Sequence, residues 1–176
     1  MMLSLLTAIA LTQAAPPGPA IAPGTIAVKP PTPADPSKPS PYQPFTDALR
    51  DALTNANFTT IPGVDNARYV VTFTVERTSH GAVRSSARNG GVLGVGGGSV
   101  AVALGTGKSA IGELVSTELS VKVMRRGETV AAWTGSAVTH QVAGTRDDEP
   151  SRVAEKLSTA LFRNFPQESG LTVSVP

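Results

Sequence analysis

Three segments of the chain carry apolar residues at every second position, and this pattern constrains the fold more than any other feature. The segments are residues 69–76, 115–123 and 130–139. A period of two places successive side chains on opposite faces of a sheet, so each segment is predicted to be a half-buried strand. Arg125–Glu128 lies between the last two and contains Gly127, which predicts a hairpin turn. Trp133 lies in the apolar phase of the third segment, so we expect it to be buried.

Two other segments have the spacing of amphipathic helices. The apolar face of the first consists of Phe45, Leu49, Ala52 and Leu53. We predict Thr46 as its N-cap and an end within residues 55–57. The apolar face of the second consists of Val153, Leu157, Ala160, Leu161 and Phe165. Pro150 suits its first turn, Pro166 ends it, and the acidic residues 147–149 lie where the helix dipole favours negative charge.

The order of these elements predicts an α+β fold. A shorter strand is expected at residues 58–61, and residues 25–29 are interpreted as an edge strand. Residues 171–175 have two interpretations, an extra strand or a loose tail. We therefore expect a mainly antiparallel sheet of four to six strands with two helices packed on one face.

The first 44 residues predict an export signal followed by a spacer. Residues 1–15 contain no charged side chain and a short apolar run that ends in small residues, which is typical of a secretory signal peptide. The chain has no cysteine, so the lipobox of a lipoprotein is missing. Residues 16–44 contain 11 of the 15 prolines and predict an extended linker before a domain over residues 45–176. We expect export to the periplasm or cell envelope.

A glycine-rich excursion interrupts the strands over residues 81–112, which contain ten of the 17 glycines. One interpretation is a long flexible loop, because glycine loses the most entropy on ordering. A second is a glycine zipper, in which small residues let helices or membranes approach closely. A third is a phosphate loop at residues 105–109, but the pattern requires a glycine where Val102 stands, and no helix pattern follows.

Cations gather around this excursion, and no acidic residue occurs between Glu76 and Glu113. We therefore take a candidate binding set from the cations and from the glycines that repeat every four residues. It consists of Arg77, Arg84, Arg88, Lys108, Gly90, Gly94 and Gly98. If these residues converge, they would suit lipid phosphates or an anionic polysaccharide.

Composition excludes several chemistries. Without cysteine, and with His80 and His140 as the only histidines, the chain cannot build a thiolate site or a three-histidine zinc site, and no cofactor is expected. A net charge of +2 does not indicate nucleic-acid binding. Ser79 or Ser109 could in principle combine with His140 and Asp147 in a serine–histidine–aspartate site, but the sequence contains no nucleophile-elbow motif.

Residues 45–166 resemble a family of bacterial envelope proteins, mostly lipoproteins, that is defined only as a domain of unknown function. The resemblance rests on the strand at 67–71, the W-x-G motif within residues 130–137, and the final Phe165-Pro166. It implies an envelope location and supplies no catalytic residues. The chain departs from the family in lacking the lipobox cysteine.

Two functional hypotheses follow. The first is a non-catalytic, exported binding or assembly module whose glycine-rich excursion contacts the envelope or a protein partner. The second is an envelope hydrolase with an unrecognised serine–histidine–carboxylate site. We expect no transmembrane helix in the mature chain, although peripheral membrane contact fits the first hypothesis.

Overall fold

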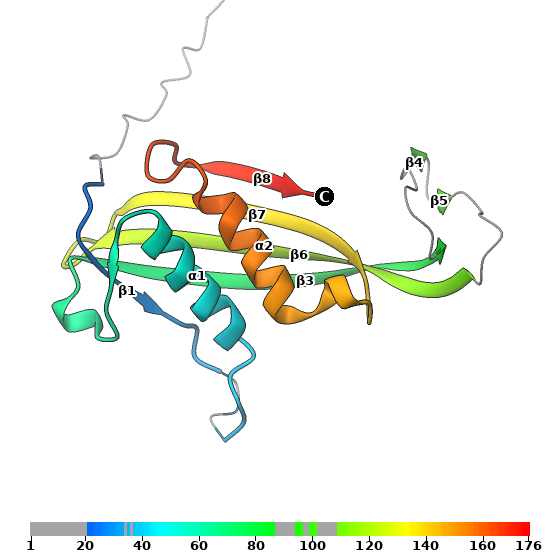
Figure 1. The fold of residues 1–176 in the computed structure, drawn as a ribbon, viewed down its shortest axis with the longest axis horizontal. Helices are drawn as coiled ribbons and strands as arrows, with labels where there is room; N and C mark the ends of the chain where they lie inside the picture. The colour runs from blue at the N-terminus through cyan, green and yellow to red at the C-terminus, as the bar shows by residue number, and fades with distance from the viewer. Residues whose placement is uncertain (1–20, 34, 36, 87–93, 97–98, 102–108) are drawn as a thin grey trace, which may run out of the picture.

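The computed structural model describes residues 21–33, 35, 37–86, 94–96, 99–101 and 109–176. The predicted signal peptide and half of the glycine-rich excursion lie outside these residues. The chain forms a six-stranded sheet in the order β2-β1-β3-β6-β7-β8 (Figure 1). Its strands are β1 (Thr25–Lys29), β2 (Thr59–Thr60), β3 (Tyr69–Ser86), β6 (Ser109–Arg125), β7 (Ala131–Val142) and β8 (Leu171–Val175). A separate two-stranded sheet pairs β4 (Gly94–Gly96) with β5 (Ser99–Ala101).

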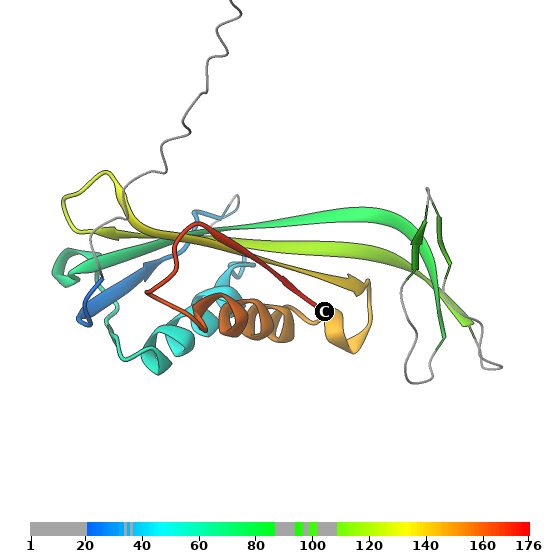
Figure 2. The ribbon, with the colours of Figure 1, turned by 90° about the horizontal axis from the view of Figure 1, so that it is seen from above.

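Two α-helices, α1 (Gln43–Asn55) and α2 (Pro150–Phe162), cover one face of the six-stranded sheet (Figure 2). The predicted α+β class and the placement of both helices on one face are confirmed. Short 3-10 helices at Val64–Asn66 and Arg146–Asp148 precede β3 and α2. Neither helix in the described part of the chain is long and apolar enough to cross a bilayer.

The sheet is mixed, so the prediction of a mainly antiparallel sheet is wrong. Three of its five pairings, β1–β2, β1–β3 and β7–β8, are parallel, and β3–β6 and β6–β7 are antiparallel. The reason is that helices are inserted between β1 and β3 and between β7 and β8, and a helical crossover joins parallel strands. Helix α1 connects β1 to β2, helix α2 is followed by β8, and both helices lie on the same face of the sheet (Figure 2).

The strand at residues 25–29 is also not at the edge of the sheet. It pairs with β3 over residues 26–29 and with β2 through Thr25 and Ile26. Ile26 and Ala27 are fully buried. The segment therefore belongs to the folded domain and not to the linker predicted around it.

The alternation of the three long strands is confirmed by burial. The helix-facing residues include Tyr69, Val71, Leu119, Val121 and Val123, each at most 1% exposed. They pack in one core with Leu49 and Leu53 of α1 and Leu157 and Leu161 of α2. Trp133 is buried in the same core, as expected, and the hairpin turn closes with Gly127 at φ +83°.

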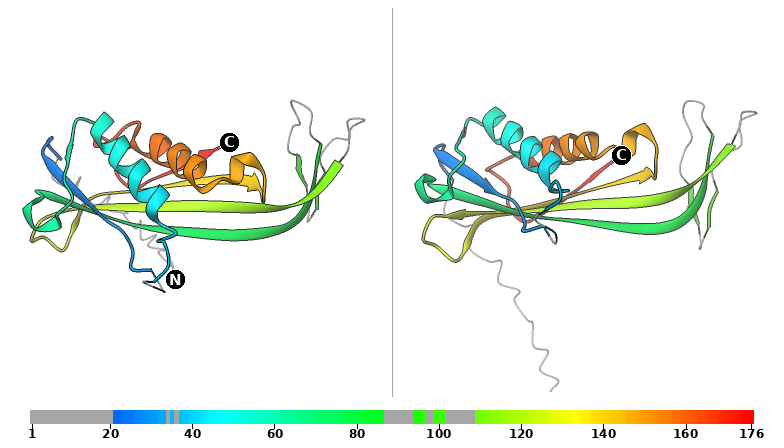
Figure 3. Two further views of the ribbon diagram at one scale, coloured as in Figure 1. Left: turned by 60° about the horizontal axis from the view of Figure 1, so that its bottom comes forward. Right: turned by 90° about the horizontal axis from the view of Figure 1, so that it is seen from below.

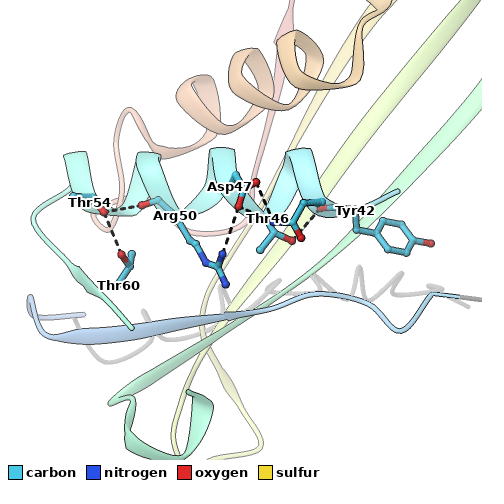
Figure 4. A network of polar contacts seen from close by, with 7 residues as sticks. Tyr42, Thr46, Asp47, Arg50, Thr54 and Thr60 are labelled. Atoms are coloured by element: carbon cyan, nitrogen blue, oxygen red, sulfur yellow. Dashed lines mark hydrogen bonds and ion pairs between the residues drawn. The ribbon is translucent and has the colours of Figure 1, made fainter. Parts of the chain in front are cut away.

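The start of α1 differs from the prediction, because the helix begins at Gln43 with Tyr42 at the N-cap. Pro44 occupies the first turn, where its missing N–H costs nothing. Thr46 therefore lies inside the helix, and its hydroxyl donates to the Tyr42 carbonyl at 3.0 Å (Figure 4). Helix α2 starts at Pro150, as predicted, but ends at Phe162, before Phe165.

Candidate functional site

The most distinctive feature of the fold is a two-stranded ribbon that extends beyond the sheet. Strands β3 and β6 pair as far as Ser86 opposite Ser109, whereas β7 ends with Val142 opposite Leu114. On its other side, β3 pairs with β1 only as far as Thr72. In the described part of the chain, no strand pairs with either outer edge of the ribbon past these points. Apart from the Ala143 N–H, which donates to the Glu113 carbonyl at 2.7 Å, the described residues show no further backbone hydrogen bond to these outer edges. This part of the ribbon therefore has backbone N–H and C=O groups available for pairing.

A β-bulge lies at the root of the ribbon. Ser79 pairs with Val115 and Ala82 with Glu113, so His80 and Gly81 together oppose a single residue of β6. Gly81 has φ +92°, a conformation that side chains disfavour. Bulged strands bend, and the far part of the ribbon curves toward the helix side of the sheet (Figures 2 and 3).

An ion pair ties the ribbon root to the connection between β7 and α2. One guanidinium nitrogen of Arg77 lies 2.7 Å from Oδ1 and 2.8 Å from Oδ2 of Asp148. The Gly144 N–H also donates to Oδ2 at 3.0 Å. The hydrogen bond from Arg77 lowers the pKa of Asp148, and the same bond raises the pKa of Arg77. Asp148 therefore pairs with the Arg77 guanidinium. It also lies just before α2, as the sequence predicts.

We expect Asp148→Asn to lower the free energy of unfolding by about 1 kcal/mol at pH 7, a value reduced because Arg77 is half-exposed. The folded pKa of Asp148 lies below its unfolded value, so this stabilisation is present above the unfolded pKa. It is lost as the pH falls through the folded pKa. Urea unfolding at several pH values should show the gap between variant and parent closing below about pH 4. Asp147→Asn, at an exposed neighbouring carboxylate, is the control. A gap that persists at low pH would contradict the assignment.

Most of the predicted binding set lies outside the described residues, so its convergence stays a prediction. Arg77 is engaged by Asp148, and Arg84 lies further along β3, paired through its backbone with Ile111. Gly94 starts β4 opposite Ala101. Arg88, Lys108, Gly90 and Gly98 lie outside the described residues, as does the side chain of Arg84.

The structure does not bring together the serine, histidine and aspartate side chains considered from the sequence. Ser79 pairs with Val115, which faces the helices, and its hydroxyl donates to the Glu113 carboxylate. His140 pairs with Ser116 on the opposite face of the sheet. Ser109 lies at the far end of β6, and exposed Asp147 lies in the turn after β7.

A different cluster, of His80, Ser116 and His140, lies on the open face of the sheet. The His80 Nε2 lies 2.7 Å from the Ser116 Oγ, and the ring centroids of His80 and His140 are 5.9 Å apart. Sequence reasoning missed this cluster because it depends on the register of three strands. The sequence shows only that His140 directly follows the alternating segment 130–139 and that His80 lies four residues after the segment 69–76.

A cluster of three arginines at the other end of the sheet was also missed. Arg68, Arg125 and Arg126 line one pocket of about 300 Å³ together with Thr25, Asn66 and Glu128. Arg125 pairs with Glu128 at 4.0 Å, and Arg126 donates to the Asp65 carbonyl. The Arg68 guanidinium lies over the Tyr69 ring, 5.4 Å from its centroid. The cluster joins the β6–β7 hairpin to the start of β3.

A groove of about 770 Å³ between α1 and α2 is lined by neither histidine nor cationic side chains. Its ionisable lining residues are Asp47, Asp51 and Glu155. A hydrolytic site of the predicted type therefore does not lie there.

Searches with protein-family models and against curated proteins find no match to this chain, so the envelope-family resemblance stays a prediction.

Proposed function

We propose that this chain is an exported, non-catalytic binding or assembly module of the bacterial cell envelope, and that the ribbon with its glycine-rich tip is the contact element. The observation that carries the proposal is the continuation of β3 and β6 beyond β7. An isolated two-stranded ribbon is only marginally stable in water. The part of β3 and β6 that has no third strand beside it therefore adds little to the stability of the fold. Unpaired ribbon edges are suited to binding by strand addition.

The construction of the ribbon root supports the same proposal. The bulge at His80–Gly81 sets the direction of the ribbon, and the Arg77–Asp148 pair ties its base to the β7–α2 connection. A contact element needs this kind of fixed base. The alternative of an envelope hydrolase is supported only by the Ser116–His80 contact, which lies on the open sheet face.

The proposal predicts that residues 89–107 are dispensable for folding and needed for function. In this segment, β4 and β5 pair with each other and not with the six-stranded sheet. Replacing residues 89–107 with a short Gly-Ser turn should leave the thermal midpoint within a few degrees, since halving a loop changes its closure entropy by only about 0.6 kcal/mol. The same variant should lose its association with envelope fractions of the native host.

A photo-crosslinking amino acid placed at exposed Ala82 gives an independent test. It should capture an envelope component, whereas the same group at exposed Arg163, after α2, should not. Unfolding of the loop-replacement variant would contradict the proposal, as would unchanged fractionation together with equal capture from both positions. Ester hydrolysis that is abolished by Ser116→Ala would favour the hydrolase instead.

A further inference from the structure

The two histidines of the chain, the only ones it has, lie side by side on the open face of the sheet. His80 comes from β3 and His140 from β7, with β6 between them. Their ring centroids are 5.9 Å apart with the ring planes tilted by 58°. Both side chains are exposed, so burial does not account for the juxtaposition.

We propose that His80 and His140 together bind a divalent transition-metal ion of the imidazole-preferring class, with Zn²⁺ as the probe. Zinc–nitrogen distances are about 2.0–2.1 Å, so two imidazoles on one tetrahedral ion have ring centroids roughly 5–6 Å apart. The observed separation of 5.9 Å lies within this range. Imidazole favours Zn²⁺, Ni²⁺ and Cu²⁺ over hard cations.

The surroundings of His80 resemble those of a metal ligand. The Ser116 Oγ lies 2.7 Å from Nε2 of His80 and 3.5 Å from the Thr78 carbonyl. Metal-ligating histidines usually use their second ring nitrogen in a hydrogen bond that fixes the ring orientation. In this arrangement Nδ1 of His80 is the nitrogen that remains for the ion.

Negative charge beside the pair is an independent observation that favours a cation. In the next row of the sheet Glu76 lies directly opposite Glu118, and like charges in this position are destabilising. In the described part of the chain neither carboxylate has an ion-pair partner. Lys122 lies two rows beyond Glu118 on the same strand face. A divalent ion at the histidine pair would relieve the repulsion between the carboxylates.

Water would occupy the remaining coordination positions of the ion. Among the described residues, no third histidine or acidic side chain joins the pair closely enough to form a ligand cluster. The ion would then join β7 to the bulge of β3 across the intervening strand, which is where the ribbon begins.

The test is titration of the full chain with ZnCl₂, followed by calorimetry and by histidine-selective NMR. We expect one Zn²⁺ per chain, with the signals of both histidines changing at the same saturation. Single His80→Ala and His140→Ala variants should each lose at least about tenfold in affinity. His80→Gln, which keeps a polar side chain beside Ser116, provides a second variant at that position. Mg²⁺ should not compete, because it prefers oxygen ligands.

Charge variants separate this site from general surface binding. Glu118→Gln should weaken Zn²⁺ binding by about two- to fivefold through the lost Coulomb attraction. Glu155→Gln, on the far side of the sheet in α2, should leave it unchanged. The proposal is overturned if Zn²⁺ does not bind, if only one histidine responds, or if both single histidine variants retain the parental affinity.

Discussion

Replacement of Trp133 by alanine should cost about 3–5 kcal/mol of the free energy of unfolding, the largest effect expected for a single side chain here. Trp133 is 2% exposed and stacks on Phe162 at 5.5 Å between ring centroids. Phe165 meets the same indole edge-on at 5.0 Å, and the indole Nε1 donates to the Glu168 carbonyl. Truncation would leave a cavity between β7 and α2 and an unsatisfied carbonyl. A marginal domain would lose much of its stability.

Urea unfolding followed by far-UV circular dichroism measures this cost without depending on tryptophan fluorescence. Val130→Ala is the matched control, because Val130 is 74% exposed near the start of the same strand. We expect that control to change the stability by less than about 0.5 kcal/mol. A cost below about 1 kcal/mol for Trp133→Ala would mean that the indole is not part of the core.

The second large effect is expected at Gly135, where even one methyl group is too large. A Cβ at this position would lie 2.6 Å from Cη2 of Trp133 and 2.9 Å from Cδ1 of Leu161. Gly135→Ala should therefore cost about 1–3 kcal/mol through overpacking. Because Trp133 supplies the closest contact, the Trp133→Ala/Gly135→Ala double variant should cost less than the sum of the two single changes.

Gly63→Ala is the control for this prediction, since a Cβ there meets nothing within 4 Å and φ is −99°. In the same urea series, Gly63→Ala should have a free energy of unfolding close to that of the parent protein. Additive effects of Trp133→Ala and Gly135→Ala would show that the two positions do not share this contact. Coupling between them would account for the W-x-G spacing in physical terms. Residues two apart on a strand lie on one face, and the indole covers the position that lacks a side chain.

Several features were predictable because they depend on local patterns. Alternation in residues 69–76 and 115–123 identified which face of each strand is buried, and the 3.6-residue spacing identified both helices. The hairpin at Arg125–Glu128 followed from Gly127. The predicted N-cap of α1, Thr46, is four residues after the observed one, Tyr42, because Thr46 has the side chain of a typical cap whereas the proline of the first turn marks the true start.

The direction of the outer strands was not predictable from these patterns. Residues 25–29 and 171–175 have the same local pattern whether they pair parallel or antiparallel. Their orientation results from the crossovers through α1 and α2, which require parallel neighbours.

The arrangement of the chemically active side chains was decided by tertiary structure alone. A register shift between Val123 and Met124 places His140 opposite Ser116, and the bulge after Ser79 accommodates His80 on the same face. Arg77 and Asp148 form an ion pair although they are 71 residues apart in the sequence. A one-residue change of register would move a whole row of side chains to the other face. Composition and periodicity therefore determined which elements form and which sides are buried. The register, set by backbone pairing and core packing over the whole sheet, determined which polar groups meet.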